Sequence, residues 1–200
     1  VARLPHAGVL LMSVAEQWFG TVLPARFTLA HYQSIFTQPL TSVSIQNSLF
    51  YSILSTLLDV AMGVIVAFLL ARRKFHGSSL LDALVMLPLA LPGIIVAFGY
   101  VATFSGTILD PRVNPTILLV LSYGMRRLPY MVRSAYAGFQ QTSVTLEEAA
   151  QSLGATPART MRRITIPLIA ATLVAGMLLC FAYAMLEVSD SLILAMREEF

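Results

Sequence analysis

Carboxylate side chains within or beside uncharged segments are the groups in these 200 residues best placed to do chemistry. Asp59 is the only charged residue in an apolar run at residues 45–71. A carboxylate in such surroundings is costly unless it faces a polar cavity or a partner, which favours a place on an ion or substrate pathway. A hydrogen bond with Ser or Thr on a neighbouring helix also explains Asp59, so both interpretations stay open.

Two further carboxylates, Glu187 and Asp190, follow an uncharged run at residues 167–186. A helix over that run would cross about 30 Å of hydrocarbon. The two acids therefore lie at the end of a predicted membrane-spanning helix. They either contact a transported substrate or only mark the membrane interface.

Pro88, Pro92 and Gly93 interrupt another apolar run, at residues 84–104. Proline removes a helical hydrogen bond and clashes with the preceding turn, so the run should kink or break at these positions. The three residues predict either a hinge in a translocation path or a static kink.

The polar segment at residues 145–167, TLEEAAQSLGATPARTMRRITIP, predicts two short helices joined by a tight turn. Thr145 and Glu148 have the spacing of a capping box, which begins a helix that continues through Leu153. Gly154 supplies the left-handed residue that commonly ends such a helix. The segment therefore predicts a helical hairpin between two membrane spans.

The second helix of this hairpin is expected to start at Thr156 and Pro157, a cap followed by a first-turn proline. It carries Arg159, Arg162 and Arg163, whose i, i+3 and i+4 spacing puts them on one face. An arginine face suits lipid phosphates, so an interfacial hairpin is one interpretation. Docking to another protein is the other.

Motifs for hydrolysis, redox chemistry and metal binding are missing from the sequence. Lys74 is the only lysine and lies in RRKFHGS, so no phosphate-binding loop of the G-x-x-x-x-G-K-[ST] type is present. His6, His31 and His76 are scattered without ligand spacing, and Cys180 is a single cysteine. We therefore expect no catalytic residue, no metal site, no cofactor bound by this chain and no nucleic-acid partner.

The composition places these residues in a membrane. The sequence is 57% hydrophobic and 12% charged, with a mean hydropathy of +0.77. A soluble domain carries about 25% charged residues. The apolar residues also gather in runs long enough to cross a bilayer, which predicts an all-α polytopic bundle.

Two further apolar runs complete an expected bundle of about five spans. Residues 115–125 are short, and span only if the helix continues through Arg126, Arg127 and Pro129 with the arginines reaching an interface. Residues 7–15 are interpreted as the outer part of a first span.

The distribution of Lys and Arg predicts the orientation, because cytoplasmic loops retain an excess of them. Nine of the 13 basic residues fall between spans two and three or between spans four and five, so these loops are expected in the cytoplasm. The nine are Arg72, Arg73, Lys74, Arg126, Arg127, Arg133, Arg159, Arg162 and Arg163. The loop at residues 20–44 carries only Arg26 and is expected outside.

The helical hairpin resembles the EAA loop of binding-protein-dependent ABC importer permeases. That pattern is E-A-A, three residues, G, nine residues, I, one residue and L-P. The matching positions are Glu148, Ala149, Ala150, Gly154, Ile164, Ile166 and Pro167, with Ile166 in place of the usual leucine. The likeness covers residues from about 45 to the end. Within the superfamily, ferric-iron-type permeases and their relatives for phosphonate, thiamine or polyamine uptake look most similar.

The resemblance implies a type I ABC importer transmembrane domain from a unit of six spans. Residues 1–44 would hold a partial first span and an outer loop, and residues 45–200 the domain, with the cytoplasmic coupling loop at residues 139–166. Because the sequence begins at Val1 and not Met and stops at Phe200 after a charged turn, we expect a fragment cut at both ends, with the domain truncated at its C-terminus.

The resemblance also implies partners. The first hairpin helix would sit in a groove of a separate ABC ATPase dimer that uses ATP and Mg, with Glu148 as an electrostatic contact and Gly154 as a pivot. Arg159, Arg162 and Arg163 would contact that ATPase or lipid. A second permease half, a periplasmic binding protein and the lipid bilayer of a bacterial inner membrane complete the expected multi-pass assembly.

Two other function classes remain for comparison. An ion-coupled secondary transporter centred on Asp59 needs no ATPase, but it leaves the hairpin without a role. A membrane enzyme has no visible catalytic group. The ferric-type likeness suggests iron as cargo, although the external binding protein supplies most of the specificity in this class.

Overall fold

The computed structural model describes residues 4–73 and 75–195, and the regular elements in these ranges are helices. The expected all-α class is therefore confirmed. The chain divides into two compact units, Val1–Gln46 and Asn47–Phe200.

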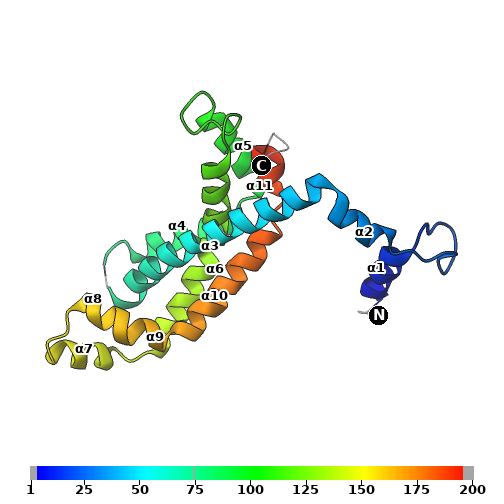
Figure 1. Ribbon diagram of the computed structural model, residues 1–200. Helices are drawn as coiled ribbons and strands as arrows, with labels where there is room; N and C mark the ends of the chain where they lie inside the picture. Colours follow the sequence, from blue (N-terminus) through cyan, green and yellow to red (C-terminus); the bar gives the residue numbers. More distant parts are fainter. Residues whose placement is uncertain (1–3, 74, 196–200) are drawn as a thin grey trace. The chain divides into compact units, whose positions relative to one another are not determined.

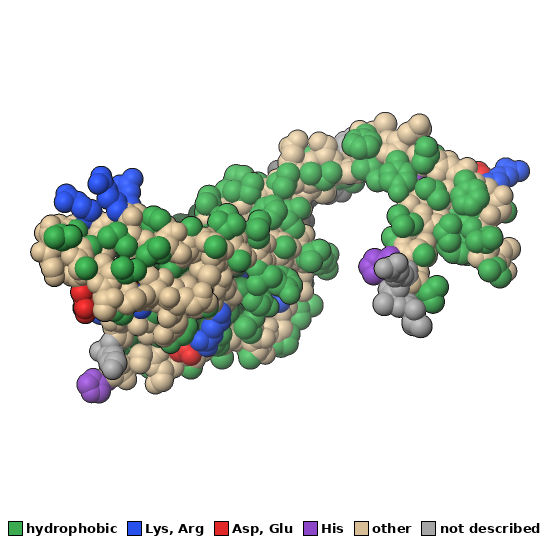
Figure 2. Space-filling model, turned by 90° about the horizontal axis from the view of Figure 1, so that it is seen from below, with side chains coloured by type: hydrophobic (Ala, Val, Ile, Leu, Met, Phe, Trp, Pro, Cys, Tyr) green, Lys and Arg blue, Asp and Glu red, His purple; other side chains and the backbone are tan. Residues whose placement is uncertain are grey.

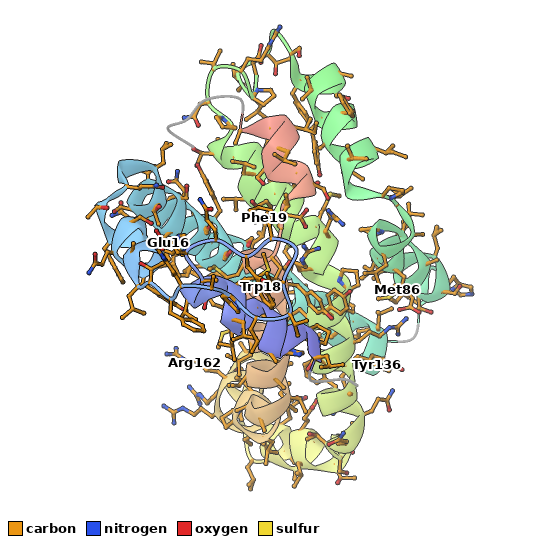
Figure 3. The ribbon with its side chains drawn as sticks, turned by 90° about the vertical axis from the view of Figure 1, so that its right-hand side faces the viewer. Glu16, Trp18, Phe19, Met86, Tyr136 and Arg162 are labelled. Carbon is orange, nitrogen blue, oxygen red and sulfur yellow. The ribbon has the colours of Figure 1, made fainter. Side chains whose placement is uncertain are left out.

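The first unit holds two short helices, α1 (Leu4–Val14) and α2 (Ala30–Thr37). Figure 3 labels Glu16, Trp18 and Phe19 in the loop between them. An isolated antiparallel bridge between Ala15 and Phe27 closes this loop. Residues 20–44 were expected as an outer loop, but α2 and the start of α3 make much of that segment helical.

The longest helix is α3 (Pro39–Arg72), which contains the predicted apolar run. Its part Leu40–Arg72 is the one described helix that is long and apolar enough to cross a membrane without a break. Across the described residues the number of candidate spans rises to three if each of two bent helix pairs is one span.

The first bent pair is α4 (Ser78–Ala90) with α5 (Gly93–Phe104), which meet at 102°. The predicted interruption of this apolar run is confirmed, and it falls between α4 and α5. Pro88 lies inside α4, whereas Leu91 and Pro92 separate the two helices and Gly93 begins the second.

The helix α6 (Thr116–Gln141) continues through Arg126, Arg127 and Pro129, as the fourth predicted span required. At 1.5 Å per residue it is about 39 Å long. It packs along α10 (Ala170–Met185), and Figure 1 shows the two side by side. Small residues allow this close approach, because a Cβ atom on Gly176 would lie 2.8 Å from the Ser134 Cβ atom.

The second bent pair joins the hairpin to α10. After α7 (Val144–Ser152), the chain forms α8 (Pro157–Thr160), a π-helical turn η1 (Met161–Thr165) and α9 (Ile166–Leu168). The segment Pro157–Leu168 meets α10 at 74°. The predicted span at residues 167–186 therefore starts later, at Ala170.

Two apolar clusters fill the second unit. One packs Val66, Met131 and Phe139 near α9, and the other packs Tyr51, Leu118 and Leu194 near α5 and α11 (Ser189–Leu194). Figure 1 shows α7, α8 and α9 at one end of this unit and α5 and α11 at the other. On the long helices, the buried polar residues Asp59 and Arg127 fall between members of the two clusters.

Candidate functional site

Residues at the two ends of α7 cap the helix. Its N-cap is Ser143, whose hydroxyl accepts a hydrogen bond from the Thr145 backbone N–H at 3.3 Å. The predicted capping box of Thr145 and Glu148 is therefore wrong, because the helix begins two residues earlier. Thr145 lies inside the first turn, and its hydroxyl is 2.7 Å from that of Ser143.

The turn after α7 has the predicted left-handed glycine. Gly154 has a φ of +87°. Its backbone N–H donates to the Gln151 carbonyl at 2.9 Å, and that of Ala155 donates to the Ala150 carbonyl at 3.0 Å. These two bonds form a Schellman motif, in which a residue with a Cβ atom would be strained.

The second hairpin helix also starts as predicted. The Thr156 hydroxyl accepts from the Arg159 backbone N–H at 3.3 Å, and Pro157 occupies the first turn. Arg159, Arg162 and Arg163 are all exposed. Figure 2 shows a group of Lys and Arg side chains at the end of the second unit where α8 lies, and Figure 3 labels Arg162.

The residues of the predicted coupling motif differ in exposure. Glu148 and Ala149 are exposed, Ala150 and Ile164 are half-buried, and Pro167 is exposed in α9. The first hairpin helix thus presents Glu148 and Ala149 on its open side. Leu153, which follows α7, is 90% exposed and adds an apolar group beside them.

Glu147 was not among the predicted site residues, but it is buried on a different side of α7 from the exposed Glu148. Its carboxylate lies 3.1 Å from the Nε atom of Arg72, the last residue of α3. Successive helical residues point about 100° apart. The 100° step allows one of two adjacent glutamates to face inward while the other is exposed, but the sequence does not show which one is buried or what its partner is.

Asp59 lies on a buried polar face of α3. Ser52, Ser55, Thr56 and Asp59 follow helical spacing, and each is at most 5% exposed. Ser55 donates to the Ser52 carbonyl, whereas Ser52 Oγ, Thr56 Oγ1 and Asp59 Oδ2 have no hydrogen-bond partner among the described residues.

A second group of buried charges joins α6 to Glu187, just after α10, and to Asp190 in α11. Arg126 Nη1 lies 2.9 Å from Glu187 Oε1 and 3.4 Å from Asp190 Oδ1. Arg127 pairs with the other oxygen of Glu187 and donates to the Tyr183 carbonyl at 3.1 Å. The Glu187 and Asp190 side chains are 4% and 0% exposed, so both acids are desolvated and paired.

This cluster corrects the expected position of two arginines. Arg126 and Arg127 were assigned to a cytoplasmic loop, but they lie within α6. They pair with Glu187, just after α10, and Arg126 also pairs with Asp190 of α11, at the end of the unit remote from the hairpin. Both guanidinium groups are largely buried against Glu187, which supplies their counter-charge. The expectation that Glu187 and Asp190 either contact substrate or mark an interface did not include this pairing.

The bend between α4 and α5 contacts the same cluster. A Cβ atom added to Gly93 would overlap the Arg126 guanidinium group, so glycine leaves that arginine its space. A groove of ≈ 520 Å³ lies beside the bend, lined by Pro88, Tyr100 and Arg126 among others. Pro88 and Gly93 thus lie close to Arg126. Asp59, on α3, does not line this groove.

A compact loop follows α5 at the end remote from the hairpin. Asp110 accepts hydrogen bonds from Arg112 Nη2 and from the Gly106 backbone N–H, both at 2.7 Å. These bonds hold the pKa of the Asp110 carboxyl group well below its usual range, and the bond from the Arg112 side chain has the largest effect. The loop leaves Ile108 fully exposed.

Comparison with known proteins identifies the class. Residues 60–195 match the family described as the inner membrane component of binding-protein-dependent transport systems. The match covers more than half of the chain, and the chain belongs to this family. The alternative class of ion-coupled secondary transporter is therefore not supported.

Individual relatives carry different cargo names. The chain is 34% identical over 171 residues to a molybdate/tungstate transport system permease protein of Pyrococcus furiosus, covering 84% of this chain and 66% of that protein. It is 31% identical over 166 residues to a ferric transport system permease protein of Actinobacillus pleuropneumoniae, covering 81% and 24%. The chain thus spans less than two thirds of either relative.

A solved structure supports the fold. The chain is similar to the crystal structure of a bacterial ABC transporter involved in the import of the acidic polysaccharide alginate. The match covers 97% of this chain and 72% of the matched chain, with a TM-score of 0.62 and 19% identity. Together with the family match, this confirms the type I ABC transporter membrane domain inferred from the hairpin motif.

Proposed function

We propose that this chain is the membrane-spanning part of an ATP-driven importer and that α7, Gly154 and α8 dock on a separate ATPase. The observation that carries the proposal is the open side of α7. Glu148 and Ala149 are exposed there while the capping and Schellman bonds hold the helix in shape. A rigid helix with a free carboxylate suits a groove that contains a basic group.

The energy source in this proposal is the partner. ATP and Mg bind the ATPase subunits, because this sequence has no phosphate-binding loop. Closure of two ATPase subunits would draw two such helices together, so a second permease half is required. Ile164 and Pro167 connect the hairpin to α10, and Arg159, Arg162 and Arg163 are free to contact the ATPase or lipid phosphates.

The proposed setting is the inner membrane of a bacterium, crossed several times by this chain. A periplasmic binding protein would deliver cargo to the end that carries Ile108. Asp59, Pro88, Pro92 and Gly93 are the residues we assign to the translocation path. Asp59 has an unpaired oxygen, and the bend at Pro92 lies next to a groove.

The proposed cargo is a small inorganic ion. A molybdate-type oxyanion comes first, because the chain matches the molybdate/tungstate relative at higher identity and over more of that protein's length. Ferric iron is the second candidate. Uptake by the complete transporter from molybdate, tungstate or ferric citrate, each against excess sulfate, would separate the two.

The docking proposal is tested by co-purification of the full-length membrane protein with its ATPase. Glu148→Arg and Gly154→Leu should both lose association and binding-protein-stimulated ATP hydrolysis. Gly106→Leu is the matched control for Gly154→Leu, because Gly106 also has a positive φ, +78°, with no atom within 4 Å of an added Cβ. Unchanged association in both hairpin variants, with folded protein in the membrane, would contradict the proposal.

A further inference from the structure

An ion pair ties the hairpin to the longest helix. Arg72 ends α3 and Glu147 lies in the first turn of α7, with 3.1 Å between Arg72 Nε and Glu147 Oε1. The side chains are only 9% and 12% exposed. Water therefore screens this pair far less than it screens an exposed pair.

Arg72 makes a second set of contacts, with the end of α6. Its Nη2 atom donates to the Thr142 carbonyl at 2.9 Å, where α6 has just ended. Its guanidinium carbon lies 5.7 Å from the centroid of the buried Phe139 ring. The planar, forked guanidinium group can make these contacts together, which the single ammonium group of lysine cannot.

Glu147 also makes a second contact. The oxygen that binds Arg72 accepts a hydrogen bond from Thr165 Oγ1 at 3.3 Å. Thr165 is fully buried and ends η1, just before α9 and the bend into α10. One carboxylate thus joins α7 to both α3 and the segment that leads into α10.

We infer that Arg72, Glu147 and Thr165 form a positioning strut that carries movement of α7 into α3 and α10. The inference rests on the proposed function, in which α7 is the helix that the ATPase moves. In this scheme Glu148 contacts the ATPase and Glu147 transmits the displacement. Neither Arg72 nor Glu147 touches cargo or nucleotide.

The geometry explains why a strut is needed at this place. Gly154 lies in a tight turn, and the path from α7 to α10 then passes through a π-helical turn and a 74° bend. If α7 were connected to α10 only through this path, a displacement of α7 would change the angles of these bends without moving α10. A buried ion pair resists separation because each charge would be left without its counter-charge.

The test uses the complete transporter with its ATPase and binding protein in lipid vesicles. The variants are Glu147→Gln, Arg72→Gln and the double variant, with Arg73→Gln as the matched exposed control. We expect each single variant to keep the ATPase bound and hydrolysing, while substrate imported per ATP falls by about tenfold. The double variant should fall no further than either single variant, because both remove the same interaction.

The readout is import per ATP, which a simple loss of folded protein does not change. Import per ATP at the native value in Glu147→Gln would overturn the strut. Equal proportional loss of binding, hydrolysis and import would also overturn it, as would effects that add in the double variant. A native chain that fails to bind the ATPase would overturn the proposed function first, so the two failures are distinguishable.

Discussion

At the scale of single residues, charge alone does not decide what a side chain does. Glu147 and Glu148 are neighbours, yet one is buried against Arg72 and the other is exposed. Arg126 and Arg162 are both arginines that were expected in cytoplasmic loops. The first lies inside α6 against Glu187 and the second is exposed on η1. The helical phase and the nearest counter-charge separate these roles.

Glu187 is the residue whose loss should cost the most stability in the buried charge cluster. It is the shared partner of Arg126 and Arg127, so Glu187→Gln would leave two guanidinium groups poorly compensated. Breaking a buried pair costs about 3 kcal/mol or more. We expect a clearly lower melting temperature in detergent, measured against Glu16→Gln as an exposed control. Equal melting temperatures would show that the pair is dispensable.

At the scale of elements, the close contact of α6 and α10 depends on small side chains. A Cβ atom on Gly138 would overlap the Thr172 hydroxyl group, and one on Gly176 would press on Ser134. Helices in membranes gain little from the hydrophobic effect between them, so close van der Waals packing carries much of their association. The glycines therefore set the distance between the two helices.

Substitution at this contact should separate the helices. Gly176→Ala places its methyl group 2.8 Å from the Ser134 Cβ atom, which cannot rotate away. Overpacking of this kind costs about 1–3 kcal/mol, so we expect a lower melting temperature. Gly99→Ala in α5 is the control, since no atom lies within 4 Å of its added Cβ. The packing argument fails if Gly176→Ala is as stable as Gly99→Ala.

At the scale of the whole second unit, polar and apolar residues are separated along its length. The hairpin and its arginines lie at one end, the Asp110 loop with Ile108 lies at the other, and a buried polar layer runs between two apolar clusters. With Arg126, Arg127 and Arg133 inside α6, the other described basic residues of this unit still concentrate at the hairpin end, in the hairpin itself and at the end of α3. On the positive-inside rule we expect that end to face the cytoplasm.

This orientation can be tested with a membrane-impermeant maleimide. Arg162→Cys should react only when the cytoplasmic face is open, and Ile108→Cys only from the outside. The native chain is the control, because its single cysteine, Cys180, is fully buried. Reaction of both variants from the same side would contradict the arrangement.

The sequence by itself determined the membrane class, the breaks and the hairpin. Long apolar runs, Pro92 with Gly93, and Gly154 act through local physical rules that need no partner: hydrocarbon thickness, lost hydrogen bonds and a left-handed backbone. The spacing from Glu148 to Pro167 also indicated the family correctly. These features depend on residues close together in the chain.

Only the tertiary structure decided which charges meet. Arg72 and Glu147 are separated by 75 positions, and Arg126 and Glu187 by 61. No short-range pattern records such pairs, because they arise when helix length, crossing distance and side-chain direction are all set together. For the same reason the sequence did not show that Arg126 and Arg127 lie within α6. Their burial depends on Glu187, a distant carboxylate that supplies the counter-charge.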